Sequence, residues 1–200
     1  MIFFDEHTKT FYLESKNVSY IFCVNECGFL NHLYYGKRIS REDLSHTVYL
    51  VDRGHGSNIA GKWRDKSLNV YANECPAYGR SDYRESMLAF DFDGVRVGDF
   101  VYSGYTIYDK KPTLEGLPSV RGNQTLEIIL KDDLHGAKVS LYYTVFEDLP
   151  VILRHAKIEN ESEKPFILDR AYSFCVDMPD KEWQAITLPG AHLRERFAER

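Results

Sequence analysis

The sequence lacks the features of membrane, secreted and nucleic-acid-binding proteins. No apolar stretch approaches the roughly 20 residues that a membrane-spanning helix needs. The first residues, MIFFDEHTKTF, carry acidic side chains where a secretory signal has a positive start. The net charge is −5, and lysine and arginine form no basic stripe. We therefore expect a cytoplasmic protein that binds neither membranes nor nucleic acids.

Cysteine is too scarce for a disulfide scaffold. Four cysteines occur in 200 residues, at Cys23, Cys27, Cys75 and Cys175, without the paired spacing of a zinc site. We expect all four to be reduced, with Cys23 and Cys175 buried inside strands. The seven histidines also lack metal-ligand spacing, so the sequence predicts neither a metal site nor a cofactor.

Convincing helical periodicity is also absent, whereas strand-forming residues are abundant. Aromatic residues make up 14% of the chain, with 14 Tyr and 12 Phe, and aromatic side chains favour strands. Within residues 137–145, Val139, Leu141 and Tyr143 follow the period of two expected of a strand. Short turns flank this stretch, which predicts an antiparallel meander over residues 125–177. We therefore predict an all-β fold, an antiparallel β-sandwich of stacked sheets.

One long segment interrupts the strand pattern. Over residues 37–84 the alternation stops, Gly54, Gly56 and Gly61 loosen the backbone, and charged residues collect. A connection of this length in a compact domain is usually functional or disordered. The presence of Trp63, Tyr71 and Tyr78 favours an ordered, functional loop. The polar chemistry is densest at its end, in ECPAYGRSDYR, residues 74–84.

A set of motifs resembles a known family. In chain order they are LYYGKRI, VDRG, ECPAYGRSDYRES, LEGLPSV, TLEIILKD, VSLYYTVFEDLPVILRHAKIENES and LPGAHLRER. Their order and spacing over residues 11–196 are similar to those of the N-terminal β-sandwich domain of the bacterial α-galactosidases of glycoside hydrolase family 36. The resemblance implies that residues 1–200 are a fragment of such a domain, of the supersandwich type and truncated before completion. It also implies that residues 37–84 form an active-site and interface element.

The resemblance also carries expectations about activity. Members of the family are retaining glycosidases that remove terminal α-linked galactose from oligosaccharides such as melibiose and raffinose. Such enzymes need two carboxyl groups about 5 Å apart, which the family places in a separate barrel, and the motifs that carry them do not occur here. We therefore expect no catalytic residue and no activity in this chain alone. The resemblance implies a homo-oligomer, a tetramer in the full-length parent.

The resemblance implies substrate-binding roles for two residues of the long segment. In the family, an Asp and an Arg from this loop reach the sugar pocket of a neighbouring subunit, and they match Asp52 in VDRG and Arg64. A carboxylate accepts hydrogen bonds from two hydroxyls, and a guanidinium donates a planar pair. Arg53 and Trp63 are further candidates, since the Trp63 ring could stack on a galactose face or anchor an interface.

We interpret the end of the segment as structural. An Asp and an Arg two residues apart beside a turn usually form an internal ion pair, which we predict for Asp82 and Arg84. We expect Glu74 to have a similar structural role. Pro76 and Gly79 are expected to fix the turn that presents the loop.

Three functions remain open at this stage. The chain could be an accessory domain that completes the sites of a neighbouring α-galactosidase subunit, a free-standing carbohydrate-binding module, or an interaction domain whose loop only buries an interface. A binding module usually presents several aromatic residues along exposed strands. The candidate ligands here are charged and lie in one loop, which favours the accessory domain.

Overall fold

The structure is a computed structural model that describes residues 1–48, 52, 58–59, 61–80, 82–116, 119–178 and 182–192, with only the backbone of Trp63. The described regular structure is almost entirely β, as predicted. The strands are β1 (Ile2–Asp5), β2 (Thr10–Ser15), β3 (Val18–Val24), β4 (Leu30–Lys37), β5 (Leu88–Asp91), β6 (Val101–Tyr108), β7 (Thr125–Asp132), β8 (Ala137–Val145), β9 (Ile152–Asn160) and β10 (Ile167–Ala171). Three 3-10 helices are described, all between β4 and β5: η1 (Ser45–Thr47), η2 (Gly61–Trp63) and η3 (Leu68–Val70).

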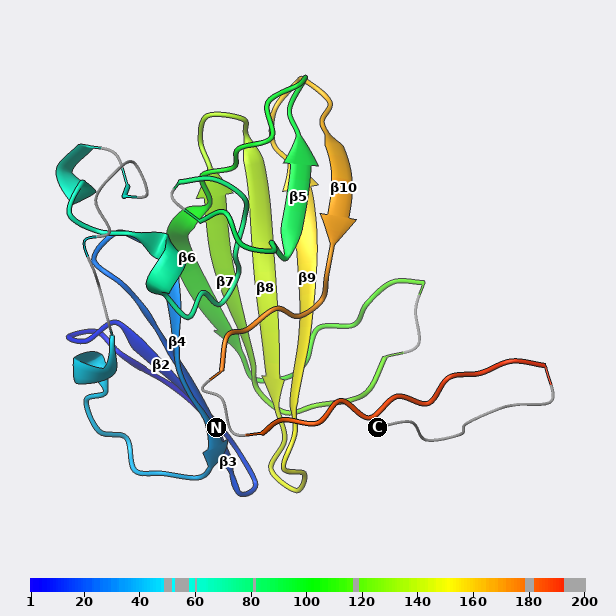
Figure 1. The fold of residues 1–200 in the computed structure, drawn as a ribbon. Coiled ribbons are helices and arrows are strands. Elements are labelled where there is room, and N and C mark those ends of the chain that lie inside the picture. The colour runs from blue at the N-terminus through cyan, green and yellow to red at the C-terminus, as the bar shows by residue number, and fades with distance from the viewer. Residues whose placement is uncertain are drawn as a thin grey trace.

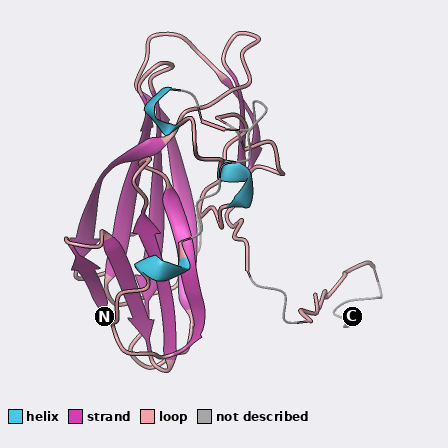
Figure 2. Ribbon diagram, turned by 60° about the vertical axis from the view of Figure 1, so that its left-hand side comes forward, coloured by secondary structure: helices cyan, strands magenta, loops and turns pink. Residues whose placement is uncertain are grey.

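The strands form three antiparallel sheets. Two sheets have four strands each, in the orders β1-β2-β3-β4 and β6-β7-β8-β9, and β5 pairs with β10 in a third sheet. Neighbours in the larger sheets are consecutive in sequence, and short turns join most of them, whereas the longer stretch 109–124 connects β6 to β7. Figure 1 shows the β6–β9 sheet behind β5 and β10, with the β1–β4 sheet beside its lower part. Figure 2 shows most strands gathered on the left, a smaller pair at the upper right, and the described part of the C-terminal segment, in pink, lying away from the strands.

The core lies between the two four-stranded sheets. Phe11 of β2 and Phe22 of β3 are fully buried, and the Phe22 ring lies 5.1 Å from the ring of Tyr143 in β8. The predicted alternation of β8 is confirmed, because Val139, Leu141 and Tyr143 all face this core with no exposed surface. Fully burying side chains of this size contributes about 1.5–3 kcal/mol each. This shared apolar layer makes the architecture a β-sandwich.

The predicted meander is correct for three strands and wrong for the fourth. Strands β7, β8 and β9 pair in sequence, but β10 leaves the sheet and pairs with β5, with Ile167 opposite Asp91 and Ala171 opposite Leu88. A strand's period does not reveal its partner, and consecutive strands are neighbours only about two-thirds of the time. The prediction for Cys175 is also wrong, since it lies after β10 and outside any strand, whereas Cys23 is buried in β3.

The described helices are all short. Each of the three 3-10 helices has three residues, so none of the helices in this part of the chain is long enough to cross a membrane.

Candidate functional site

The segment between β4 and β5 contains every predicted site residue. Figure 1 shows it, in cyan to green, leaving the β1–β4 sheet and crossing towards β5. Part of it runs beside β4: the N–H of His32 donates to the carbonyl of Ala72 at 2.7 Å, and the N–H of Glu74 donates to the carbonyl of Leu30 at 3.2 Å. These bonds satisfy backbone groups that an uncovered edge strand would expose.

The first residues of the segment are held against β2 by a buried carboxylate. Glu14 accepts hydrogen bonds from Arg38 at 2.5 Å and from two nitrogens of Arg41 at 2.8 and 3.0 Å. The hydrogen bond from Arg41 lowers the pKa of Glu14 and outweighs the opposing effect of burial. Tyr12 in the same strand donates to the carbonyl of Glu42 at 2.8 Å. The chain therefore turns back over β2 immediately after β4.

The two predicted substrate-binding residues are connected by one amide. The Asn58 side-chain nitrogen Nδ2 donates to Asp52 Oδ1 at 2.5 Å and to the backbone carbonyl of Arg64 at 2.7 Å. Asp52 and Arg64 are exposed, while Asn58 is half-buried. The structure therefore brings together two residues that are well separated in sequence, through a third that the sequence did not single out.

A small second core supports this group. Ile59, next to Asn58, is 1% exposed and packs with Leu68, Tyr71 and Cys27. The N–H of Ile59 also donates to the carbonyl of Lys66 at 2.7 Å. The backbone beside Asn58 is thus anchored, although the acidic and basic side chains near it point to solvent.

The other two candidates are Arg53 and Trp63. Arg53 lies outside the described residues. Trp63 is the last residue of η2, and its side chain is outside the described part of the chain. Their roles therefore remain predictions.

Glu74 lies at the junction of the two large sheets. Its carboxylate has no exposed surface and accepts hydrogen bonds at Oε1 from Tyr20 at 2.5 Å and from Tyr143 at 2.9 Å. On the other oxygen, His32 Nδ1 lies 3.2 Å from Oε2. Arg154 of β9 completes the group, with Nη1 3.0 Å from Oε1 and Nη2 donating to the backbone carbonyl of Glu74 at 2.5 Å.

The charges of this group are balanced. Burial raises the pKa of Glu74, but the positive charge of Arg154 and the hydrogen bonds from His32 and Tyr20 outweigh burial, so the pKa lies below its usual value. Burial and the negative charge of Glu74 raise the pKa of Tyr20 well above its usual value, which keeps the phenol protonated as a donor. A buried carboxylate with a charged partner and several donors is a stable anchor for the segment.

The end of the segment forms a second polar network. Asp82, 2% exposed, accepts a hydrogen bond from Asn73 at 2.5 Å and forms an ion pair with Arg84 at 3.0 Å. Arg84 also donates to the carbonyl of Leu68 at 3.1 Å and to Asp177 at 2.7 Å. Burial lowers the pKa of Arg84, but the hydrogen bond and charge of Asp82 outweigh it and raise the pKa above its usual value.

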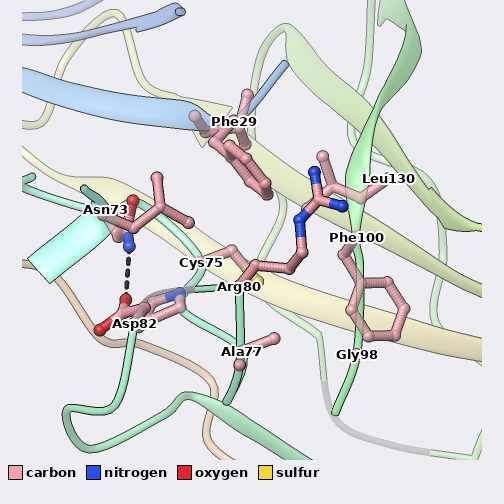
Figure 3. A pocket seen from close by; sticks show the side chains of 13 residues that line it. Phe29, Asn73, Cys75, Ala77, Arg80, Asp82, Gly98, Phe100 and Leu130 are labelled. Atoms are coloured by element: carbon pink, nitrogen blue, oxygen red, sulfur yellow. Dashed lines mark hydrogen bonds between the residues drawn. The ribbon is translucent and has the colours of Figure 1, made fainter. Parts of the chain in front are cut away.

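Gly79 sits at the turn between these networks. Its φ is +112°, which L side chains rarely adopt, and a Cβ at this position would lie 2.4 Å from Val97 Cγ1. Its backbone exchanges two hydrogen bonds with Asp82, at 2.9 and 3.0 Å. A cavity of about 20 Å³ lies beside the turn and holds at most one water molecule. Figure 3 shows the bond between Asn73 and Asp82 at one side of this cavity.

The two parts of the segment suit different chemistry. The carboxylates of Glu74 and Asp82 are buried and bound by protein donors, so they are not presented to a ligand. Asp52 and Arg64 offer an exposed acceptor and an exposed donor group that match sugar hydroxyls. Among the described residues, no three His, Cys, Asp or Glu side chains are grouped so as to hold a metal ion.

Sequence reasoning missed Asn58 and the partners of Glu74. Arg154 carried a signal, because the period of β9 places it on the inward face with Ile152 and Ala156, where a charged side chain needs a partner. Asn58 carried none, because a single Asn in an irregular segment has no periodicity that indicates its contacts.

Comparison with known proteins indicates a family. The family model described as the glycosyl hydrolase family 36 N-terminal domain matches residues 28–200. The alpha-galactosidase AgaA of Geobacillus stearothermophilus is 36% identical over 98% of this chain, and alpha-galactosidase 1 of Pediococcus pentosaceus is 33% identical over 100% of it. The chain spans 28% of the length of each of these two curated relatives.

Solved structures are similar in fold as well as in sequence. The GH36 alpha-galactosidase AgaB from Geobacillus stearothermophilus matches 100% of this chain with a TM-score of 0.91 at 36% identity. A structure of AgaA A355E D548N from the same organism, in complex with raffinose, matches 96% with a TM-score of 0.88 at 36% identity. The chain covers 28% and 27% of these two solved chains.

Proposed function

The chain belongs to the N-terminal domain family of glycosyl hydrolase family 36, and we propose that it acts as the non-catalytic N-terminal domain of an α-galactosidase. The observation that carries this proposal is the identity of 36% and 33% with proteins named alpha-galactosidase, over nearly the whole of this chain but only 28% of their length. The catalytic carboxylates then lie in the remainder of the enzyme. No cofactor is needed for this reaction, since two carboxyl groups suffice for glycoside hydrolysis.

The proposed substrates are oligosaccharides that end in α-linked galactose, such as melibiose and raffinose. Solved structures of AgaA variants include complexes with raffinose and with stachyose, which supports this substrate class. Galactose presents several hydroxyls to a binding site, and an exposed carboxylate and guanidinium are suited to bind them.

Within the enzyme, we assign residues 37–84 a role at a subunit boundary. Asp52 and Arg64 bind galactose hydroxyls in the pocket of a neighbouring subunit of a homo-oligomer, which we propose to be a tetramer. Their exposure leaves both side chains accessible to such a neighbour. Glu74, Gly79, Asp82 and Arg84 instead hold the segment in shape, through the buried contacts described above.

A cytoplasmic location is part of the proposal. Cys23, Cys27, Cys75 and Cys175 are all free thiols, and Cys23 and Cys27 are buried. Persistent free cysteines are typical of a reducing compartment.

The test is kinetic, in the full-length gene product that carries this chain. Asp52→Ala and Arg64→Ala should each lower kcat/KM for raffinose by about ten- to a hundredfold, since a hydrogen bond to a charged group contributes about 1.5–3 kcal/mol. Asp65→Ala and Lys62→Ala serve as matched controls in the same segment. Sedimentation velocity of each variant separates a lost contact from a lost oligomer.

Two results would contradict the proposal. Absence of α-galactosidase activity in the full-length product would remove the enzymatic assignment. Unchanged kcat/KM in intact oligomers of both variants would leave the segment a structural interface. Titration of this chain with galactose distinguishes the alternative of a free-standing carbohydrate-binding module, which binds without any further domain.

A further inference from the structure

We propose that Asn58 is a positioning residue that orients the Asp52 carboxylate for ligand binding. This inference rests on the proposed function, because it takes Asp52 to accept hydrogen bonds from sugar hydroxyls. Asn58 itself need not touch the sugar. Its role is to hold the acceptor in place before the sugar arrives.

The geometry of one amide group carries this inference. The Asn58 Nδ2 group has two hydrogens and donates to two acceptors, Asp52 Oδ1 at 2.5 Å and the Arg64 carbonyl at 2.7 Å. Because the amide is planar, the bond to the Arg64 backbone fixes the direction in which the remaining hydrogen points. A hydroxyl side chain has a single hydrogen and could not serve both acceptors.

The backbone beside Asn58 is held in place by the small core. The neighbouring Ile59 is 1% exposed, and its N–H donates to the carbonyl of Lys66 at 2.7 Å. Asp52 is exposed, and its Oδ1 accepts the hydrogen bond from Asn58 at 2.5 Å. The small core therefore holds Asn58 in place, and Asn58 in turn orients the Asp52 carboxylate.

A carboxylate held in its binding orientation loses less conformational entropy when the ligand binds. Preorganisation of this kind improves affinity, and Asn58 would affect the bound sugar equally in the ground state and the transition state. Removal of the amide should therefore raise KM and leave kcat almost unchanged.

The experiment uses Asn58→Leu in the full-length gene product, because Leu has a similar size and no donor. With raffinose as substrate, KM should rise about three- to tenfold, the usual cost of immobilising one side chain on binding, while kcat changes by less than about twofold. The matched control is Asn69→Leu in the same segment, which should leave both constants within about twofold. Thermal unfolding of both variants checks that the fold is intact.

A double-mutant cycle distinguishes positioning from a general structural effect. In an Asp52→Ala background, Asn58→Leu should raise KM by a clearly smaller factor than in the wild-type background, because the carboxylate that it orients is gone and only its bond to the Arg64 carbonyl is left to lose. The same factor in both backgrounds, or no rise in KM in the wild-type background, would overturn the inference while Asp52→Ala still impairs the enzyme. If Asp52→Ala has no kinetic effect, the proposed role of Asp52 fails first and the inference fails with it.

Discussion

The two halves of the long segment use similar residues in opposite ways. In the half from residue 66 to 84, Glu74 and Asp82 are 0% and 2% exposed; Glu74 is bound by donors from four strands, and Asp82 by Asn73 and Arg84 of the segment itself. In the half before it, Asp52 and Arg64 are exposed and are linked through the amide of Asn58. Both halves are rich in Asp, Glu and Arg, so composition alone does not separate them.

The difference between the halves lies in where their partners come from. Glu74 is bound by Tyr20 and His32 from the β1–β4 sheet and by Tyr143 and Arg154 from the β6–β9 sheet. It therefore joins the two layers of the sandwich. The described contacts of Asp52 and Arg64 come from the segment itself. A buried polar residue that joins elements distant in sequence stabilises the fold. An exposed polar residue can also contact another molecule.

The largest expected effect comes from removing the buried anchor. Glu74→Ala leaves the guanidinium of Arg154, 6% exposed, without its carboxylate. Breaking a buried ion pair by removing one partner costs about 3–5 kcal/mol. We expect a loss of this size in the free energy of unfolding measured by urea titration.

The control for this change is an exposed glutamate of the same sandwich. Glu161 pairs with Lys131 at 2.8 Å, and its side chain is 43% exposed. Glu161→Ala should cost less than about 1 kcal/mol, the usual value for a surface pair. Equal losses for the two variants would mean that Glu74 does not anchor the segment.

A smaller effect is expected at the turn. Gly79→Ala introduces a Cβ 2.4 Å from Val97 Cγ1 at a backbone φ of +112°. Backbone strain of this kind costs about 1–3 kcal/mol. The measurement is again urea unfolding, with Gly61→Ala as the control, because Gly61 also has a positive φ but no atom within 4 Å of the added carbon.

Two causes contribute to the instability expected of Gly79→Ala, namely the clash with Val97 and the backbone strain. Combining Gly79→Ala with Val97→Ala removes the clash and leaves the backbone strain, so the double variant should recover part of the stability lost at the turn. A Gly79→Ala variant as stable as Gly61→Ala would show that the turn adapts to the added carbon and that the contact with Val97 costs nothing.

The sequence predicted the strands better than it predicted their partners. The alternation of Val139, Leu141 and Tyr143 was sufficient to predict a strand and its buried face, because a period of two depends only on the strand's own residues. The pairing of β10 with β5 was not predictable, because it depends on a tertiary choice between two available edges. The sequence of a strand therefore indicates directly which of its residues are buried. It indicates much less directly which strand is its neighbour.

The candidate site shows the same limit. Asp52 and Arg64 were reached through a family resemblance, and their roles remain predictions. Their connection through Asn58 depends on how an irregular segment folds, for which the sequence offers no periodic signal. Glu74 was predicted to be structural, but its four side-chain partners come from strands far away in the chain, so only the structure identifies them.

The smallest expected effect on stability is at the exposed half of the segment. Asp52→Ala and Arg64→Ala should each change the free energy of unfolding by less than about 0.5 kcal/mol, as surface substitutions usually do. The physical reason is that both side chains are exposed, so truncation leaves no cavity and no buried unpaired charge. Urea titration of the same variants used for kinetics makes this measurement directly.

The unfolding free energies of the Asp52 and Arg64 variants distinguish the two halves only when they are compared with the kcat/KM of the same variants. Loss of kcat/KM with unchanged unfolding would assign Asp52 and Arg64 to binding and the buried half to stability. Loss of both together would mean that the exposed half also holds the fold, since a ligand contact by itself contributes nothing to the unfolding of the unliganded protein. In that case the distinction drawn from burial would not hold for this segment, and the kinetic losses could not be read as contacts to galactose.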